Sequence, residues 1–122
     1  MGTEWPANLD CLVAAPAHHR LMLENARVRV LETEVAPGER TPVHTHRWPA
    51  VHHILSWSAF VRRDADDNVL VDTRLTGGAQ EPPSVLWGEP LDPHSLENVG
   101  AAPLRVISVE LKDAASVLAR DA

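Results

Sequence analysis

The stretch GERTPVHTHRWPAVHH, residues 38–53, holds four of the seven histidines of this chain. His44 and His46 follow a Gly/Pro turn and lie two positions apart. On a β-strand, residues two apart project from the same face, with their Cα atoms about 6 to 7 Å apart. Imidazoles at that spacing can approach one divalent ion, whose bonds to histidine nitrogen are about 2.0 to 2.1 Å for zinc. The spacing therefore predicts a metal site that needs a third ligand from another strand, and the sequence offers His94.

The segments around these histidines favour an all-β fold. Turn formers recur about every ten residues, and the segments between them are rich in Val, Ile, Leu and Trp. In ARVRVLETEV, residues 26–35, Val28 and Val30 alternate with Arg27 and Arg29, which predicts a half-buried strand with the valines inside. Further strands are expected in VHHILSWSAFVRR, NVLVDTRL, SVLWG and LRVISVEL. Only the tail DAASVLAR reads as a helix, with Asp113 as its N-cap.

Length and composition exclude several classes of function. A chain of 122 residues fits a single domain, 1–122. Its formal charge of −6 argues against nucleic acid as a partner, because phosphates call for a concentrated basic face. No apolar run approaches the roughly 18 residues of a membrane helix. The lone Cys11 cannot form an internal disulfide, and LDCLVAAPA is a poor signal peptide, so we expect a cytoplasmic protein.

These motifs resemble those of the cupins, small β-barrels or jelly rolls that hold a metal in the mouth of the barrel. Gly38, His44 and His46 have the spacing of the first cupin motif, GxxxxxHxH, and His94 with Asn98 matches the HxxxN of the second. The match extends over residues 26–111. The resemblance implies a single-domain, cupin-type jelly-roll barrel of the small conserved-barrel (cupin 2) type, with a short C-terminal helix added by the tail. It also implies that the three histidines are metal ligands.

Two departures from the family pattern change the expected chemistry. The carboxylate that normally follows the second histidine falls on Ala50 or Val51, and Glu89 and Leu91 occupy the usual Pro and Gly positions of the second motif. A site of three neutral histidines leaves a divalent ion its full charge, which attracts anionic or chelating ligands. Within the cupins, such centres are similar to those of thiol dioxygenases and diketone-cleaving dioxygenases. The chain has no tyrosine, which weakens the thiol interpretation.

His52 is the candidate for a fourth ligand. If residues 51–57 form one strand, His52 shares the parity of Ala50 and points inward, whereas His53 and Trp57 point outward. His52 is then a ligand, a hydrogen-bond donor to one, or an inward polar residue satisfied by water or backbone.

Other residues near the motifs are weaker candidates. Trp48 is expected to pack in the core or to line the pocket mouth, and Arg40 and Arg47 to lie on the surface or meet a substrate carboxylate. Asn98 is expected to fix the backbone near His94 through its amide.

Two functions of different class remain. In the first, His44, His46 and His94 hold iron(II) or manganese(II), with iron favoured over zinc or nickel, in a dioxygenase-like enzyme for a small chelating substrate. In the second, the barrel is a non-enzymatic module that binds or senses a small molecule. His18 and His19 are expected to face solvent or a subunit contact, and the segment HHRLMLEN to pair with a second copy in a homodimer.

Overall fold

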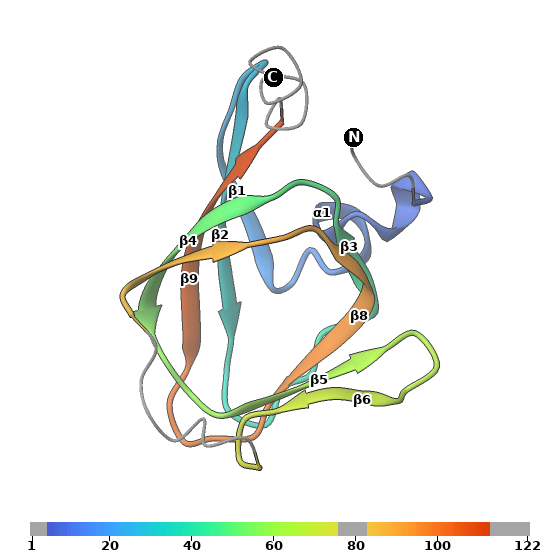
Figure 1. Cartoon of the computed structure of the whole chain (residues 1–122), viewed down its shortest axis with the longest axis vertical. Helices are drawn as coiled ribbons and strands as arrows, with labels where there is room; N and C mark the ends of the chain where they lie inside the picture. Colours follow the sequence, from blue (N-terminus) through green and yellow to red (C-terminus); the bar gives the residue numbers. More distant parts are fainter. Residues whose placement is uncertain (1–4, 76–82, 113–122) are drawn as a thin grey trace, which may run out of the picture.

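The computed structural model describes residues 5–75 and 83–112, which form two antiparallel β-sheets (Figure 1). The larger sheet has the order β1 (His19–Glu24), β2 (Val28–Val35), β9 (Leu104–Leu111), β4 (Ala50–Ser56), β7 (Val85–Gly88). The smaller sheet has the order β3 (His44–His46), β8 (Leu91–Asn98), β5 (Phe60–Asp64), β6 (Val69–Asp72). A 3₁₀ turn, η1 (Ala7–Leu9), and one short helix, α1 (Cys11–Ala14), precede them. The predicted all-β fold is confirmed.

The expected strands and the observed ones agree in most segments. The four segments expected beyond ARVRVLETEV correspond to β4 with β5, β6, β7 and β9. LDPHSLEN, the segment that contains His94, forms the strand β8, which pairs with both β3 and β5. The segment HHRLMLEN forms β1 and pairs with β2 of the same chain. The predicted C-terminal helix lies outside the described residues.

The two faces of β2 are opposite to the prediction. Arg29 is 5% exposed and Leu31 is fully buried, while Val28 and Val30 are only partly buried. The inward arginine is tolerated because two carboxylates neutralise it: Arg29 donates from Nε to Glu110 at 2.5 Å and from both terminal nitrogens to Asp10. A charge that is paired and hydrogen-bonded can be buried, so alternation of apolar residues alone gave the wrong face.

Trp57 also points the other way from its prediction. The pairing of β4 with β9 shifts register between Ile54 and Ser56, and β4 ends at Ser56. An extra residue in one strand reverses the side-chain alternation beyond it. Trp57 therefore turns into the space between the sheets, where its ring makes an edge contact with Phe60 at 5.4 Å.

The turn that carries Gly38 is joined to the end of β8. Gly38 has a φ of +84°, a left-handed conformation that favours glycine. Its N–H donates to the Asn98 carbonyl at 2.9 Å, and the Asn98 N–H donates back to Glu39. The glycine of the first motif and the asparagine of the second are thus held together, which sets β3 beside β8.

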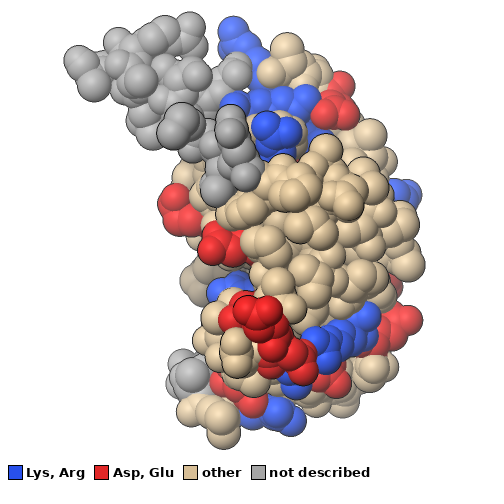
Figure 2. All heavy atoms as spheres, turned by 90° about the vertical axis from the view of Figure 1, so that its right-hand side faces the viewer, with Lys and Arg blue, Asp and Glu red and all other residues tan. Residues whose placement is uncertain are grey.

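The surface has mixed charge on the face seen in Figure 2, where acidic and basic side chains are interspersed around a broad uncharged area. No helix among the described residues has the length and apolar character needed to cross a bilayer.

Candidate metal centre

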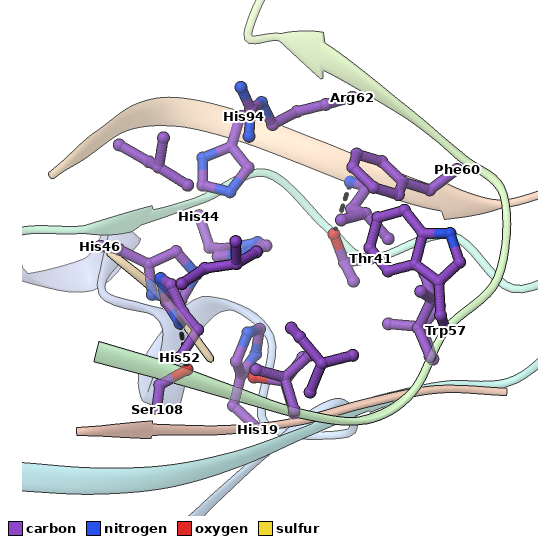
Figure 3. A pocket seen from close by; sticks show the side chains of 18 residues that line it. His19, Thr41, His44, His46, His52, Trp57, Phe60, Arg62, His94 and Ser108 are labelled. Atoms are coloured by element: carbon purple, nitrogen blue, oxygen red, sulfur yellow. Dashed lines mark hydrogen bonds between the residues drawn. The ribbon is translucent and has the colours of Figure 1, made fainter. Parts of the chain in front are cut away.

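Three histidines from two adjacent strands converge at one place. His44 on β3 stands directly opposite His94 on β8, and a register shift between His44 and His46 brings His46 to the same cluster. One ligand atom from each ring lies within 4.8 Å of the other two. The ring centroids are 4.4 Å apart for His44 and His94, 5.0 Å for His44 and His46, and 5.4 Å for His46 and His94. The rings face one another at one end of a cavity between the sheets (Figure 3).

The backbone fixes two of these rings in the form that binds metal. Nδ1 of His44 lies 2.8 Å from the Pro42 carbonyl, and Nδ1 of His94 lies 2.6 Å from the Asp92 carbonyl. A carbonyl oxygen only accepts, so both Nδ1 atoms carry the proton and both Nε2 atoms keep a free lone pair. A ring that donates its other N–H to a carbonyl is the usual arrangement of histidine ligands in metal sites.

Burial keeps the imidazoles neutral. It lowers the pKa of His94 to about 2, with smaller contributions from His44 and His46. It likewise lowers the pKa of His46 to about 3, and it lowers the pKa of His44. Neutral imidazole is the form that coordinates a metal, so the cluster is ready to bind at neutral pH. Three neutral donors within reach of one point therefore fit a divalent ion.

A buried carboxylate stands behind His46, and sequence reasoning missed it. Glu110 on β9 is 1% exposed, and its Oε2 lies 3.6 Å from His46 Nδ1. Its Oε1 accepts from Arg29, which in turn binds Asp10. Burial raises the pKa of Glu110, while the Arg29 charge opposes that rise. One feature of the sequence could have indicated Glu110. It has the same parity in LRVISVEL as Leu104, Val106 and Ser108, which line the cavity, and it is the one acidic residue of that segment.

His52 reaches the cavity wall but not the cluster. Its Nδ1 is 2.7 Å from Ser108 Oγ, and its Nε2 side faces Gly88, where a Cβ would come within 2.4 Å of that nitrogen. Among the described residues, His52 belongs to neither group of side chains that could share an ion. His53 is exposed, on the opposite face of β4.

His19 is buried beside the cluster, whereas the sequence predicted that it faces solvent or a subunit contact. It is 5% exposed, and its ring lies 4.7 Å from that of His44 and 5.3 Å from that of His46. Its Nδ1 donates to the Ala15 carbonyl at 3.0 Å, and burial lowers its pKa to about 3. Pairing of β1 with β2 carries His19 inward, and nothing in the local sequence distinguishes it from His18.

A second donor group overlaps the first. Cys11, His19 and His46 also offer ligand atoms within 4.8 Å of one another, so His46 is common to both groups. Burial and the carboxylates of Asp10 and Glu110 raise the pKa of the Cys11 thiol to about 12. Metals bind the thiolate, so this surrounding charge disfavours the second group. The donor chemistry therefore favours the group formed by His44, His46 and His94.

The cavity beside the cluster is small and mostly apolar, with a volume of about 180 Å³. Its apolar walls come from both sheets, and Figure 3 shows Trp57 and Phe60 at the end away from the histidines. The apolar lining residues are Val35, Ile54, Trp57, Phe60, Leu86, Leu91, Leu96, Leu104 and Val106. The centre thus combines three histidines that could hold a metal with a partly open cavity for a small organic molecule.

Three candidates from the sequence lie outside the cavity lining. Trp48 packs against Arg29, Arg47 and Lys112 through its ring face, and Arg47 is exposed. Arg40 pairs with Asp67.

Asn98 is fully buried, and it secures the turn after β8 and not the backbone at His94. Its amide nitrogen donates to the Val35 and Ala102 carbonyls, and its oxygen accepts from Ser58 and Gly100.

Solved structures of cupins share this fold. A cupin domain from Bordetella pertussis Tohama I has a TM-score of 0.57 and 16% identity over 77% of this chain and 91% of that chain. An RmlC-like cupin family protein with a double-stranded β-helix fold from Methanocaldococcus jannaschii has a TM-score of 0.52 and 10% identity over 76% and 77%. A conserved protein with a double-stranded β-helix domain from Klebsiella pneumoniae has a TM-score of 0.51 and 18% identity over 76% and 74%.

No protein-family model matches the sequence, and no curated protein does. At these identities the structural likeness establishes the fold alone: the chain has the double-stranded β-helix of a small cupin.

Proposed function

We propose that this protein is a metal-binding cupin in which His44, His46 and His94 hold one divalent ion, with iron(II) favoured over manganese, zinc and nickel. The observation that carries the proposal is the convergence of three neutral imidazoles from β3 and β8 at the end of an apolar cavity. The Nδ1 hydrogen bonds of His44 and His94 to backbone carbonyls add support, because they hold both rings in the ligating tautomer.

The activity that this site fits best is dioxygenase-like chemistry on a small chelating organic molecule. When bound, iron(II) supplies a Lewis acid and an electron source for oxidative cleavage or oxygen insertion. The protein supplies three neutral donors, so no ligand carboxylate reduces the charge that attracts the substrate. Glu110 lies behind His46, 3.6 Å from its Nδ1, and the apolar walls limit the access of water to the bound molecule.

Elemental analysis of freshly purified protein tests the metal site. We expect one metal ion per chain in the native protein and its loss in His44→Ala and His94→Ala. His53→Ala is the matched control, because His53 is exposed on β4 and lies outside the cavity. Oxygen uptake by the iron-loaded protein in the presence of small chelating acids or diketones then tests the reaction class.

The alternative is a non-enzymatic cupin that binds or senses a small molecule. A protein that purifies without metal, and whose melting temperature iron and zinc leave unchanged, would favour this alternative. A cytoplasmic homodimer remains our expectation for the assembled protein. Its support is the single cysteine and the position of β1 at an edge of the larger sheet, where Leu21, Met22 and Leu23 are about half exposed.

A further inference from the structure

Arg62 lies in the wall of the cavity beside the proposed metal ligands. It shares the inward face of β5 with Phe60, and it stands opposite Leu96 of β8, two residues from His94. Figure 3 shows Arg62 and His94 at the same end of the cavity. The charge of Arg62 contributes to the lowered pKa of His94, which agrees with their proximity.

The guanidinium of Arg62 has no partner among the described residues. No hydrogen bond or ion pair involves it there, and burial lowers its pKa. Its neighbour Arg63 points away from the cavity and pairs with Glu97 at 2.8 Å. Arg20, Arg29, Arg40, Arg74 and Arg105 also have acidic partners. Arg27 and Arg47, for which the described residues provide no acidic partner, are exposed to water. Arg62 is therefore the one partly buried arginine of the described residues that lacks a counter-charge.

The cavity itself offers nothing to neutralise this charge. Among the residues that line it in the described part of the chain there is no aspartate or glutamate, and the histidines are neutral. A partly desolvated cation without a partner is unfavourable, and a bound carboxylate relieves that cost through charge-assisted hydrogen bonds. The guanidinium fork matches the two oxygens of a carboxylate. The guanidinium of Arg62, without an acidic partner among the described residues, is thus a candidate binding site for a carboxylate.

We propose that Arg62 binds the carboxylate of a small organic acid whose apolar body lies against Trp57, Phe60 and Leu96. This substrate class rests on the proposed function, since Arg62 and the proposed ligand His94 lie at the same end of the cavity, so a carboxylate bound by Arg62 would lie beside the metal. The volume of about 180 Å³ is below the roughly 300 to 1,000 Å³ of pockets for drug-sized ligands, which limits the acid to a single ring or a short branched chain. Arg62 is then a residue that determines specificity.

Calorimetric titration with benzoate and its uncharged analogue benzamide tests this assignment, with isobutyrate and isobutyramide as a smaller pair. Each pair is measured on metal-stripped and zinc-loaded protein, so that binding through the metal is separated from binding through Arg62. We expect native protein to prefer the acid over the amide by about ten-fold or more in both forms. Arg62→Met should lose that preference in the metal-stripped form, Arg62→Lys should keep part of it, and Arg63→Met should keep all of it.

Several results would overturn the assignment. The assignment is contradicted if metal-stripped Arg62→Met still prefers the acid over the amide. It is also contradicted if Arg63→Met loses that preference, or if metal-stripped native protein binds neither acid better than its amide. The melting temperature of Arg62→Met should be unchanged or raised, and a large decrease would mark Arg62 as structural. Metal content is measured on the same samples, so a failure of the metal site is seen separately from a failure of the carboxylate site.

Discussion

Glu110 and His46 connect the two sheets: Glu110 Oε2 on β9 lies 3.6 Å from His46 Nδ1 on β3. Glu110 also stands opposite Ala50 in the pairing of β9 with β4. Ala50 is one of the two positions at which the carboxylate ligand of other cupins was expected. In this chain a carboxylate approaches the same region from the neighbouring strand, but it contacts the histidine and the Arg29 guanidinium.

Replacing Glu110 should destabilise the protein strongly. Glu110→Ala leaves the buried Arg29 with Asp10 alone, and breaking a buried ion pair costs about 3 to 5 kcal/mol of the free energy of unfolding. Urea denaturation of the metal-free protein measures it. Glu97→Ala, which removes the partly exposed partner of Arg63, serves as the control and should cost no more than about 1 kcal/mol. Equal losses in the two variants would show that the Glu110 network is not a stabilising element.

The metal should bind the three-histidine group and not the group that contains Cys11. Cobalt(II)-loaded protein should show no thiolate-to-cobalt charge-transfer absorption, and Cys11→Ser should retain full metal stoichiometry. His94→Ala, which affects only the first group, should lose the metal. A thiolate band that disappears in Cys11→Ser would place the ion between Cys11, His19 and His46 instead.

The stability of the metal-free protein should fall as the pH drops below about 6.5. Burial lowers the folded-state pKa of His19 and His46 to about 3 and that of His94 to about 2. Below the ordinary histidine pKa of about 6.5, the unfolded chain binds protons at these histidines, whereas the folded protein does not. Each histidine therefore lowers the free energy of unfolding by about 1.4 kcal/mol for each pH unit below that value. Above that pH the contribution is complete. The raised pKa of Glu110 has the opposite effect: as the pH rises above the ordinary glutamate pKa, Glu110 lowers the free energy of unfolding.

Urea denaturation between about pH 7.5 and 5.5 measures this dependence. His19→Gln should reduce the slope of the free energy of unfolding against pH, because one histidine that binds a proton only in the unfolded state is removed. A free energy of unfolding that stays flat across the interval would contradict the neutral, buried state of these rings.

Light scattering should give a homodimer that pairs through β1. This strand is an edge of the larger sheet, and its Leu21, Met22 and Leu23 are 46%, 50% and 52% exposed. Met22→Lys should yield monomers, because lysine on an edge strand opposes pairing with another chain. Val69→Lys is the control, since Val69 is similarly exposed on β6, one of the two edge strands of the smaller sheet. A monomeric native protein, or dissociation by Val69→Lys alone, would contradict a β1 interface.

Local pattern was sufficient to predict most of the strands and the pair His44 and His46, because side-chain alternation and turn residues act over a few positions. The same rule gave the wrong face for Arg29 and Trp57. Arg29 is inward because Asp10 and Glu110 meet it there, and Trp57 is inward because β4 shifts register against β9. Both causes depend on residues far away in the sequence.

The sequence by itself determined the all-β architecture, the histidine pair on one strand, and His94 with Asn98 as the second motif. Only the tertiary structure decided that His19 and Glu110 approach the same cluster and that Arg62 lines the cavity with no counter-charge from the described residues. The physical reason is that the partner of a buried polar group is set by strand pairing across the two sheets. Such pairing joins residues that are far apart in the sequence, such as Arg29 and Glu110 at a separation of 81 positions, and no local period encodes it.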